Sequence, residues 1–313
     1  MTLKEDNLKL SKVELEFFKQ QLGTEDEAEI KDHIVEVGTR AHKVRAQCWV
    51  LAQFLRVLKK RNLDSPQVFN YGCISEFHFV KLKSQAYDSE EFDPDRTYRR
   101  ALESCTQRED GLYIDFGCCF GADLRKAVVD GLPVQKAIGS DIQQEFWGLG
   151  HELFKSTPET FPAIFISGDA FDKAFISGRG PCAEAPTGPL PDLKTLTSFI
   201  PLQGRITAIH VANVFHLFDK EKQLELAQAL SSLLSPVPGS VIFGSQAAKE
   251  VPGEYINRRG ETSFAHSPES WKELWDGGVF PSGSIQVRAK LFPLPFAHKF
   301  GIEFAMFWSC TVV

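Results

Sequence analysis

The segment from Asp115 to Gly121 (Asp-Phe-Gly-Cys-Cys-Phe-Gly) contains the residues best suited to bind a ligand. It begins within a predicted buried strand at 112–117 and leads into a helical pattern at 121–131. Gly117 and Gly121 let the backbone turn tightly and approach a ligand without a Cβ in the way, and a following helix offers unpaired N–H groups. We therefore expect Asp115, Gly117, Cys118 and Gly121 to belong to a binding site. The Cys118 and Cys119 thiols are expected to pack rather than to act as nucleophiles.

Acidic and polar residues also follow the next three predicted strands. Asp141 ends the strand at 137–142, with Ile142 beside it, and lies 20 residues after Gly121. A carboxylate there can accept both hydroxyl hydrogens of a ribose. Asp169 ends the strand at 163–171 and could accept the amine of an adenine, with the Ala170 N–H as a second contact. Both carboxylates could instead cap the helices that follow.

The fourth predicted strand, 206–215, ends in Asn213-Val214-Phe215-His216. Ligands of open α/β sheets bind at the carboxyl ends of the strands, so all four ends should meet at one site. The turn lacks the third glycine of a dinucleotide motif, and Cys119 stands where a second glycine usually lies. A pyrophosphate needs close backbone contact there, so S-adenosylmethionine is favoured over NAD.

The elements that must position these residues alternate between strand and helix from residue 111 onward. A fifth strand is expected at 238–248, after a helix with Asp219 as its N-cap, and a further helix starts at Ser267-Pro268. The last two strands, 284–291 and 302–313, are joined by too few residues for a crossover helix and should pair antiparallel. The fold class is therefore α/β: a mainly parallel, Rossmann-like sheet of seven strands with a C-terminal antiparallel hairpin.

Two segments stand outside this alternation. Residues 1–110 read mainly as helix, with an amphipathic pattern at 28–62 in which Gly38 is a candidate break, and are expected to form a helical lid over the core at 111–313. Residues 172–203 are rich in proline and glycine. A loop of that length is either functional or a surface insertion, and the residues do not decide between them.

Composition excludes several classes of protein. The chain has 313 residues, 43% hydrophobic and 24% charged, so it can bury a sizeable core. The net charge of −6 and the scattered Lys and Arg argue against a nucleic-acid binder. No apolar run approaches the ~18–20 residues of a membrane span. Seven cysteines without framework or zinc spacing indicate reduced thiols, a cytoplasmic protein and no metal.

Several motifs in order resemble the fungal secondary-metabolite methyltransferases of meroterpenoid and terpenoid clusters, which are class I enzymes that use S-adenosylmethionine. The motifs are 115–133 with 137–141 and 146–154, Gly72-Cys73-Ile74 with Phe77 and Phe79, 215–218, 238–246, and 266–275. The resemblance implies methylation of a small hydrophobic natural product, most often on oxygen. The residues alone do not distinguish oxygen, nitrogen and carbon acceptors, and they leave a homodimer open.

Two histidines near the expected site are candidates for catalysis. His216 and His266 could remove a proton from a hydroxyl acceptor, whereas a carboxylate acceptor is already ionised and needs only alignment. Phe215, Gln246 and Trp271 are candidates to contact the acceptor, although buried aromatics more often belong to the core. Two other functions stay open: an inactive methyltransferase-like binding or regulatory protein, and a NAD(P)-dependent Rossmann oxidoreductase.

Overall fold

The computed structural model divides the chain into two compact units, each of which is built from segments that are not contiguous in sequence. The first contains residues 1–77, 119–122 and 143–162, and the second contains 78–118, 123–142 and 163–313. The structure describes residues 8, 10–52, 93–257, 260–293 and 302–313, with the backbone alone at 42–52. The Cys73 motif with Phe77 and Phe79 lies outside the described residues. The lid role expected for residues 1–110 stays a prediction.

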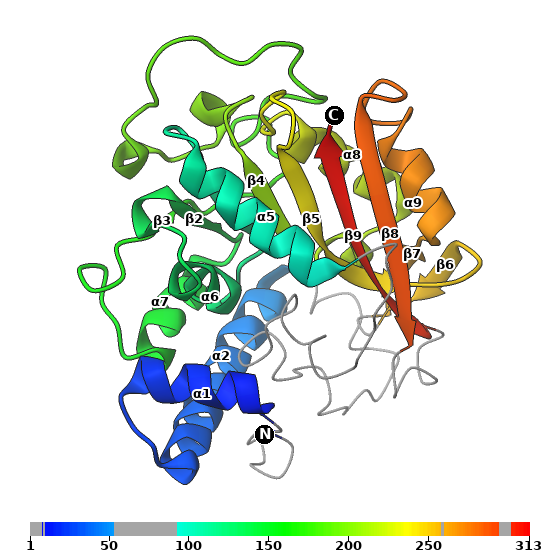
Figure 1. Ribbon diagram of the computed structural model, residues 1–313. Helices are drawn as coiled ribbons and strands as arrows, with labels where there is room; N and C mark the ends of the chain where they lie inside the picture. Colours follow the sequence, from blue (N-terminus) through cyan, green and yellow to red (C-terminus); the bar gives the residue numbers. More distant parts are fainter. Residues whose placement is uncertain (1–7, 9, 53–92, 258–259, 294–301) are drawn as a thin grey trace. The chain divides into compact units, whose positions relative to one another are not determined.

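The second unit holds a seven-stranded sheet with the strand order β3-β2-β1-β4-β5-β9-β8 (Figure 1). Pairing is parallel from β3 to β5 and antiparallel from β5 to β9 and from β9 to β8. This confirms the predicted mainly parallel, Rossmann-like sheet with a C-terminal antiparallel pair. The strands are β1 Tyr113–Phe116, β2 Ala137–Ser140, β3 Ile164–Phe165, β4 Ala208–Ala212, β5 Val241–Ala248, β8 Ile285–Pro293 and β9 Phe304–Val312.

Helices connect most of the strands, and two of them begin where the sequence predicts. The side chain of Asp219 accepts the Lys222 N–H at 2.8 Å and caps α8 (Lys220–Ser231). Ser267 forms a capping box with Ser270 at the start of α9 (Pro268–Trp275). The remaining helices are α1 Lys12–Leu22, α2 Glu27–Ala52, α5 Pro94–Gln107, α6 Ala122–Val129 and α7 Gln144–Leu153, with short 3₁₀ turns η3 Val134–Lys136, η4 Leu193–Thr195, η5 Ile200–Leu202 and η6 Phe215–Leu217.

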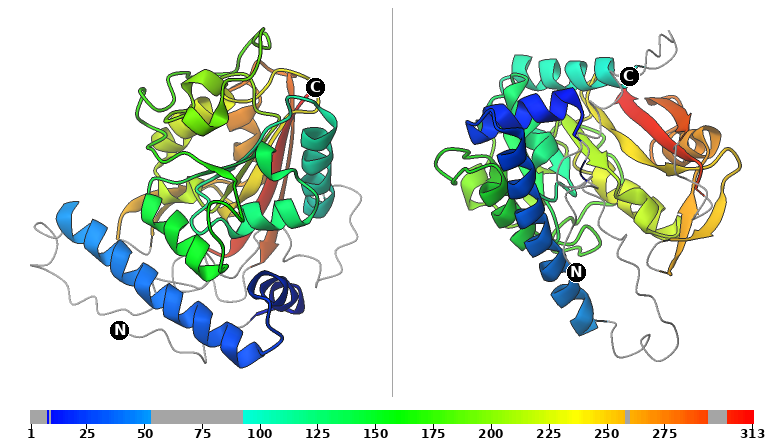
Figure 2. Two further views of the ribbon diagram at one scale, coloured as in Figure 1. Left: turned by 90° about the vertical axis from the view of Figure 1, so that its left-hand side faces the viewer. Right: turned by 90° about the horizontal axis from the view of Figure 1, so that it is seen from below.

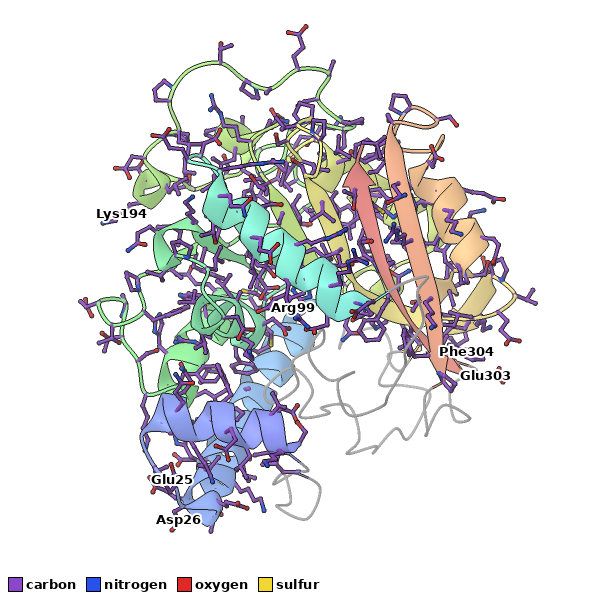
Figure 3. The ribbon with its side chains drawn as sticks, in the orientation of Figure 1. Glu25, Asp26, Arg99, Lys194, Glu303 and Phe304 are labelled. Carbon is purple, nitrogen blue, oxygen red and sulfur yellow. The ribbon has the colours of Figure 1, made fainter. Side chains whose placement is uncertain are left out.

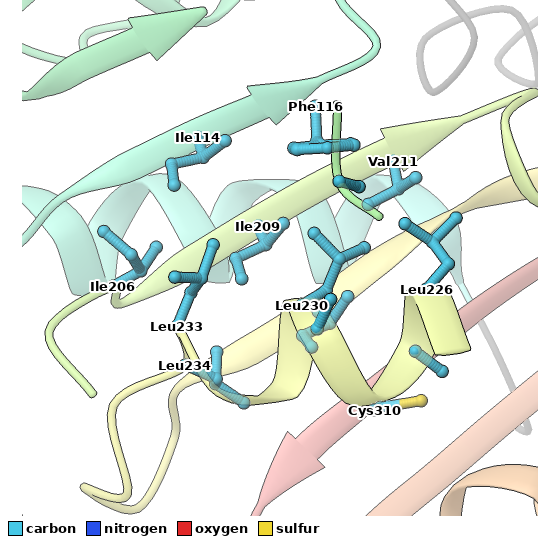
Figure 4. Close-up of a cluster of buried hydrophobic side chains, with 14 of the residues drawn as sticks. Ile114, Phe116, Ile206, Ile209, Val211, Leu226, Leu230, Leu233, Leu234 and Cys310 are labelled. Atoms are coloured by element: carbon cyan, nitrogen blue, oxygen red, sulfur yellow. The ribbon is translucent and has the colours of Figure 1, made fainter. Parts of the chain in front are cut away.

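The core of the second unit lies between the sheet and α8. Leu226 and Leu230 of α8 face Ile209 and Val211 of β4, and Ile114 and Phe116 of β1 continue the same layer (Figure 4). The helix α5 covers the opposite face, where the exposed Arg99 points away from the sheet (Figures 1 and 3). Alternate residues of β1 and β4 therefore face α8, and the residues between them face α5.

Three local predictions differ from the structure. The fourth strand, expected over 206–215, spans only Ala208–Ala212, and the 3₁₀ turn η6 begins at Phe215. The third strand, expected over 163–171, ends at Phe165; beyond it, the Gly168 N–H and the Ser167 hydroxyl both donate to the Asp141 carbonyl. A separate hairpin, β6 Gly253–Ile256 paired with β7 Thr262–Ala265, lies between β5 and α9 and was not predicted.

The insertion at 172–203 is packed against the core of the second unit. Phe175 and Phe199 are buried with ring centroids 5.2 Å apart, and the Gly180 N–H donates to the Gln228 carbonyl near the end of α8. Leu234, just after α8, forms an isolated parallel β-bridge with Ile206, just before β4. The end of α8 therefore lies beside the start of β4. The middle of the insertion is therefore anchored at the amino edge of the sheet, and Lys194 of η4 projects outward (Figure 3).

The first unit combines the N-terminal helices with α7. A Ser11–Glu14 capping box starts α1, and α2 runs without a break through Gly38, the candidate break in the sequence. A short turn connects α1 and α2 (Figure 2), and it carries the exposed Glu25 and Asp26 (Figure 3). The expected helix at 53–62 lies outside the described residues.

Candidate functional site

The carboxyl ends of β1, β2 and β4 meet at one edge of the sheet. Phe116, the last residue of β1, pairs with Ser140 at the end of β2 and with Val211 near the end of β4. The residues that follow these strands, Gly117, Asp141 and Asn213, therefore start from neighbouring positions. This arrangement brings together three of the residues predicted to bind the cofactor.

The turn after β1 requires glycine at its first position. Gly117 has φ +74°, and a Cβ there would lie 2.4 Å from Cγ2 of Val214. The N–H groups of Gly117 and Cys118 both donate to the Ser140 carbonyl, at 2.7 and 3.0 Å. Burial, together with the carboxylates of Asp115 and Asp141, raises the pKa of the Cys118 thiol well above its usual value. Cys118 is therefore a neutral packing residue whose N–H ties the turn to β2.

The rest of the turn belongs to the first unit. Cys119 is a non-glycine residue with φ +52°, and Gly121 has φ +72°. A Cβ on Gly121 would lie 2.6 Å from Cζ3 of Trp147 in α7. Both glycines of the predicted motif are thus required by left-handed backbone and by a neighbouring side chain.

Asp115 lies beneath the turn, on the face of β1 that points towards α5. Its side chain is buried, and Oδ1 lies 2.9 Å from Nδ1 of His210, the residue opposite it on β4. Because Oδ1 of a carboxylate accepts, the His210 Nδ1–H donates this bond. Asp115 was predicted to bind the cofactor; the structure joins its side chain to that of His210 in one buried pair.

The carboxylates after β2 and β3 differ in exposure. Asp141 is half-buried, and the next residue, Ile142, is 60% exposed. Asp169 is exposed, and its Oδ1 accepts a hydrogen bond from the Phe171 N–H at 2.9 Å. One of its two carboxylate oxygens is therefore already engaged in a local turn. Ala170 is buried behind it. The exposed Ile142 is a large apolar side chain at the same edge as the Asp141 carboxylate, a combination suited to a ligand with apolar and polar parts.

Asn213 directly follows β4 and starts the segment that carries His216. Asn213 is exposed with φ +57°, and its N–H donates to the Ser245 carbonyl at 2.8 Å. A non-glycine residue in this region stores strain of about 1–3 kcal/mol, which is often found at functional sites. His216 follows in η6 and is half-buried.

The β6–β7 hairpin holds the η6 segment in place. The Tyr255 hydroxyl donates to the His216 carbonyl at 2.9 Å, and the Phe264 N–H donates to the Phe218 carbonyl at 3.1 Å. Gln223 Nε2 donates to the carbonyls of both Phe218 and Phe264. The backbone of His216 is thus fixed by an element that was not predicted from the sequence.

The other four predicted residues lie deep in the second unit. Phe215, Trp271 and Gln246 are at most 2% exposed, and Phe215 packs at 5.0 Å from Trp271. His266 is 1% exposed, and its Nδ1 lies 2.9 Å from the Ser270 hydroxyl. Burial, with a smaller effect of the Lys220 charge, lowers the pKa of His266 to about 4. His266 is therefore neutral at pH 7 and a weak base, whereas His216 lies nearer the surface.

Sequence reasoning missed two groups of residues near these positions. Trp147 and Gly150 of α7 contact the turn at 120–121, and Tyr255 contacts His216. Glycines inside a helical pattern, as in Trp147-Gly148-Leu149-Gly150, signal a close packing contact and could have drawn attention to α7. The Tyr255 contact depends on the placement of a hairpin, for which the local sequence has no comparable signal.

Two classes of feature are absent from the described part of the chain. No group of three His, Cys, Asp or Glu side chains there is arranged to hold a metal ion. Within the same residues, no helix combines the length and the apolar character needed to cross a membrane.

Comparison with known proteins finds fungal relatives. O-methyltransferase phiE of a fungal species is 30% identical over 224 residues, 70% of this chain and 63% of phiE. Methyltransferase ausD of Penicillium brasilianum is 32% identical over 212 residues, 67% of this chain and 64% of ausD. The chain therefore spans less than two thirds of the length of these relatives. No protein-family model matches it. The predicted resemblance to fungal methyltransferases is confirmed.

The solved structures found by comparison share little sequence with the chain. The 1,6-didemethyltoxoflavin-N1-methyltransferase of Burkholderia thailandensis has a TM-score of 0.43 and 11% identity, with 69% of this chain and 79% of that chain covered. The O-methyltransferase of a trans-AT PKS multienzyme of Brevibacillus brevis has a TM-score of 0.41 and 14% identity, with 69% and 72% covered.

Proposed function

We propose that this chain transfers a methyl group from S-adenosylmethionine to an oxygen of a small hydrophobic natural product, in fungal secondary metabolism. The observation that carries the proposal is the edge formed by the ends of β1, β2 and β4, which places a glycine turn, a half-buried carboxylate and an exposed isoleucine together. Sequence relatives named methyltransferases support the same activity. Cytoplasmic location and a possible homodimer are part of this proposal and are open to test.

The residues at this edge suit S-adenosylmethionine. The Asp141 carboxylate can accept the hydroxyl hydrogens of the ribose, and the exposed face of Ile142 suits the adenine ring. Asp169 can accept the adenine amine, although one of its oxygens already binds the Phe171 N–H. The cofactor has no pyrophosphate, which agrees with a turn whose Gly117 and Cys118 N–H groups are already bonded to Ser140.

When bound, S-adenosylmethionine supplies a methyl group activated on a sulfonium. The protein's own residues would then mainly bind and align, because holding two reactants in line is worth up to about 7–11 kcal/mol. His216 is the best candidate to orient the acceptor or to take a proton from a hydroxyl, since it follows β4 at this edge and is half-buried. His266, Phe215, Gln246 and Trp271 would act from the core, as support for the segment that carries His216.

Binding of S-adenosylhomocysteine to the full chain tests the proposal without a known acceptor. We expect calorimetry to show one site, and Asp141→Asn to weaken binding by about 1.5–3 kcal/mol, the scale of a hydrogen bond to a charged group. Asp192→Asn is the control, because Asp192 caps η4 in the insertion and accepts only the local Lys194 N–H among its described side-chain bonds. Absence of binding by the wild-type chain would contradict the proposal, and equal affinity in Asp141→Asn would remove Asp141 from the ribose role.

A further inference from the structure

The helix α7 lies directly on the second half of the glycine turn. A Cβ added to Gly150 would come within 2.2 Å of the Phe120 carbonyl oxygen, and one added to Gly121 within 2.6 Å of the Trp147 ring. Phe120 is fully buried, with its ring 5.5 Å from that of Phe146. The backbone of α7 and the backbone of the turn are therefore in contact at a position where only glycine fits.

The C-terminal turn of α7, which also contains Gly150, is held by α2. His33 Nε2 lies 3.1 Å from the carbonyl oxygens of Glu152 and Leu153, so its N–H donates to the end of the helix. The Arg40 guanidinium forms an ion pair with the Glu152 carboxylate. Lys155, just beyond α7, pairs with Glu29 at 3.1 Å. Three polar links thus join one face of α2 to the last turn of α7.

Apolar contacts with α1 complete this arrangement. The rings of Phe18 and Phe154 are stacked at 5.5 Å, and Phe17 meets Phe154 edge-on at 5.8 Å. Phe18 and Leu153 are fully buried, and Phe154 is 2% exposed. The helices α1, α2 and α7 and residues 119–122 accordingly fall in one compact unit of the chain.

We propose that the N-terminal helices position the glycine turn through α7, with Gly150 and Trp147 as positioning residues. The inference rests on the proposed function, in which the turn helps to hold S-adenosylmethionine. It differs from the lid expected from the sequence, because a lid over the acceptor would change acceptor binding, whereas this linkage sets the affinity for the cofactor alone.

The sharpest test compares two glycines of the same helix. Gly150→Ala forces the Phe120 carbonyl to move, whereas Gly148→Ala adds a Cβ with no atom within 4 Å. With the full chain and S-adenosylhomocysteine as probe, calorimetry should show affinity reduced at least about tenfold in Gly150→Ala, which corresponds to about 1.4 kcal/mol, and unchanged in Gly148→Ala. Wild-type affinity in a folded Gly150→Ala would overturn the inference.

A second pair of variants acts on the contact between α2 and the last residues of α7, and it keeps the test decisive if Gly150→Ala does not fold. His33→Ala removes the bonds to Glu152 and Leu153, while Asp32→Ala changes the exposed neighbour on α2. We expect His33→Ala to bind the probe several-fold more weakly and Asp32→Ala to bind as wild type. Equal affinity in both would contradict the inference.

Two further measurements separate positioning from stability and from failure of the proposed function. Urea unfolding shows whether each variant is folded under the binding conditions, so a lower affinity of folded protein reports on the turn. The change in indole fluorescence on adding the probe should be reduced in Trp147→Phe.

The outcomes distinguish the two proposals. If the wild-type chain does not bind the probe, the proposed function fails. If it binds and all variants match it, only this inference fails.

Discussion

Oδ1 of Asp115 and Nδ1 of His210 lie 2.9 Å apart on neighbouring strands, with both side chains almost completely buried. The two residues are direct partners in the parallel pairing of β1 with β4, so the backbone register itself brings the side chains together. Asp115 is two residues before Gly117, and the pair therefore braces the strand from which the turn starts.

Breaking this pair should destabilise the fold. His210→Phe removes a hydrogen-bond donor from a buried carboxylate, which costs about 3–5 kcal/mol when one partner of a buried pair is lost. Arg99→Ala, which removes an exposed pair with Asp95, should cost less than about 1 kcal/mol. Urea unfolding measures both, and a similar small loss in the two variants would show that the buried pair contributes little.

The free energy of unfolding should decrease as the pH is lowered below the ordinary pKa of histidine, in part because of His266. Burial lowers its pKa to about 4, whereas an unfolded histidine has a pKa near its usual value of 6.5. Between these values the unfolded chain binds a proton that the folded chain does not, so lowering the pH favours unfolding. Across the window the loss is about 3 kcal/mol, at 1.36 kcal/mol per pKa unit.

Comparing the wild type with His266→Gln isolates this contribution. The unfolding free energy of the variant should depend less steeply on pH between about 6.5 and 4 than that of the wild type. Equal slopes in the two proteins would mean that His266 takes up its proton as readily when folded as when unfolded.

The first glycine of the turn should be coupled to Val214. Gly117→Ala places a Cβ 2.4 Å from Cγ2 of Val214 and also strains a residue at φ +74°. Val214→Ala removes the obstructing carbon, so the double variant should be more stable than the sum of the single changes predicts, by about 0.5–3 kcal/mol. Gly23→Ala, at φ +66° with no atom within 4 Å, measures the backbone strain alone. Strictly additive effects in the cycle would exclude a steric contact between the two residues.

A tyrosine in the hairpin should influence catalysis through His216. Tyr255→Phe removes the hydrogen bond to the His216 carbonyl. The control is Tyr98→Phe, which removes a hydrogen bond of the same length from Tyr98 of α5 to the Asp130 carboxylate. Each should lower stability by about 0.5–1.5 kcal/mol. With an acceptor identified from labelled S-adenosylmethionine and fungal extracts, only Tyr255→Phe should lower kcat/KM, while affinity for S-adenosylhomocysteine stays unchanged. Equal kinetics in the two variants would show that the hairpin does not position His216.

Local signals in the sequence were sufficient for most elements of the seven-stranded sheet and for the edge at which the candidate site lies, but not for the β6–β7 hairpin. Apolar runs ending in Gly117 and Asp141 predicted where β1 and β2 end, and Asp219 and Ser267 predicted two helix starts, because caps and strand periodicity depend on residues only a few positions apart. Since the ends of parallel strands share one edge, the meeting of these residues followed from the order of the elements.

Only the tertiary structure decided which side chains face one another. The pairing of Asp115 with His210, the burial of His266 and the contact of Tyr255 with His216 depend on strand order, on the face that each residue occupies and on a hairpin inserted between β5 and α9. The packing of α7 on the turn brings Gly150 against Phe120, which is 30 positions earlier in the chain. The same helix contacts His33 of α2, which is still more distant in sequence. Such contacts are set by packing between distant segments, for which a single sequence carries no periodic signal.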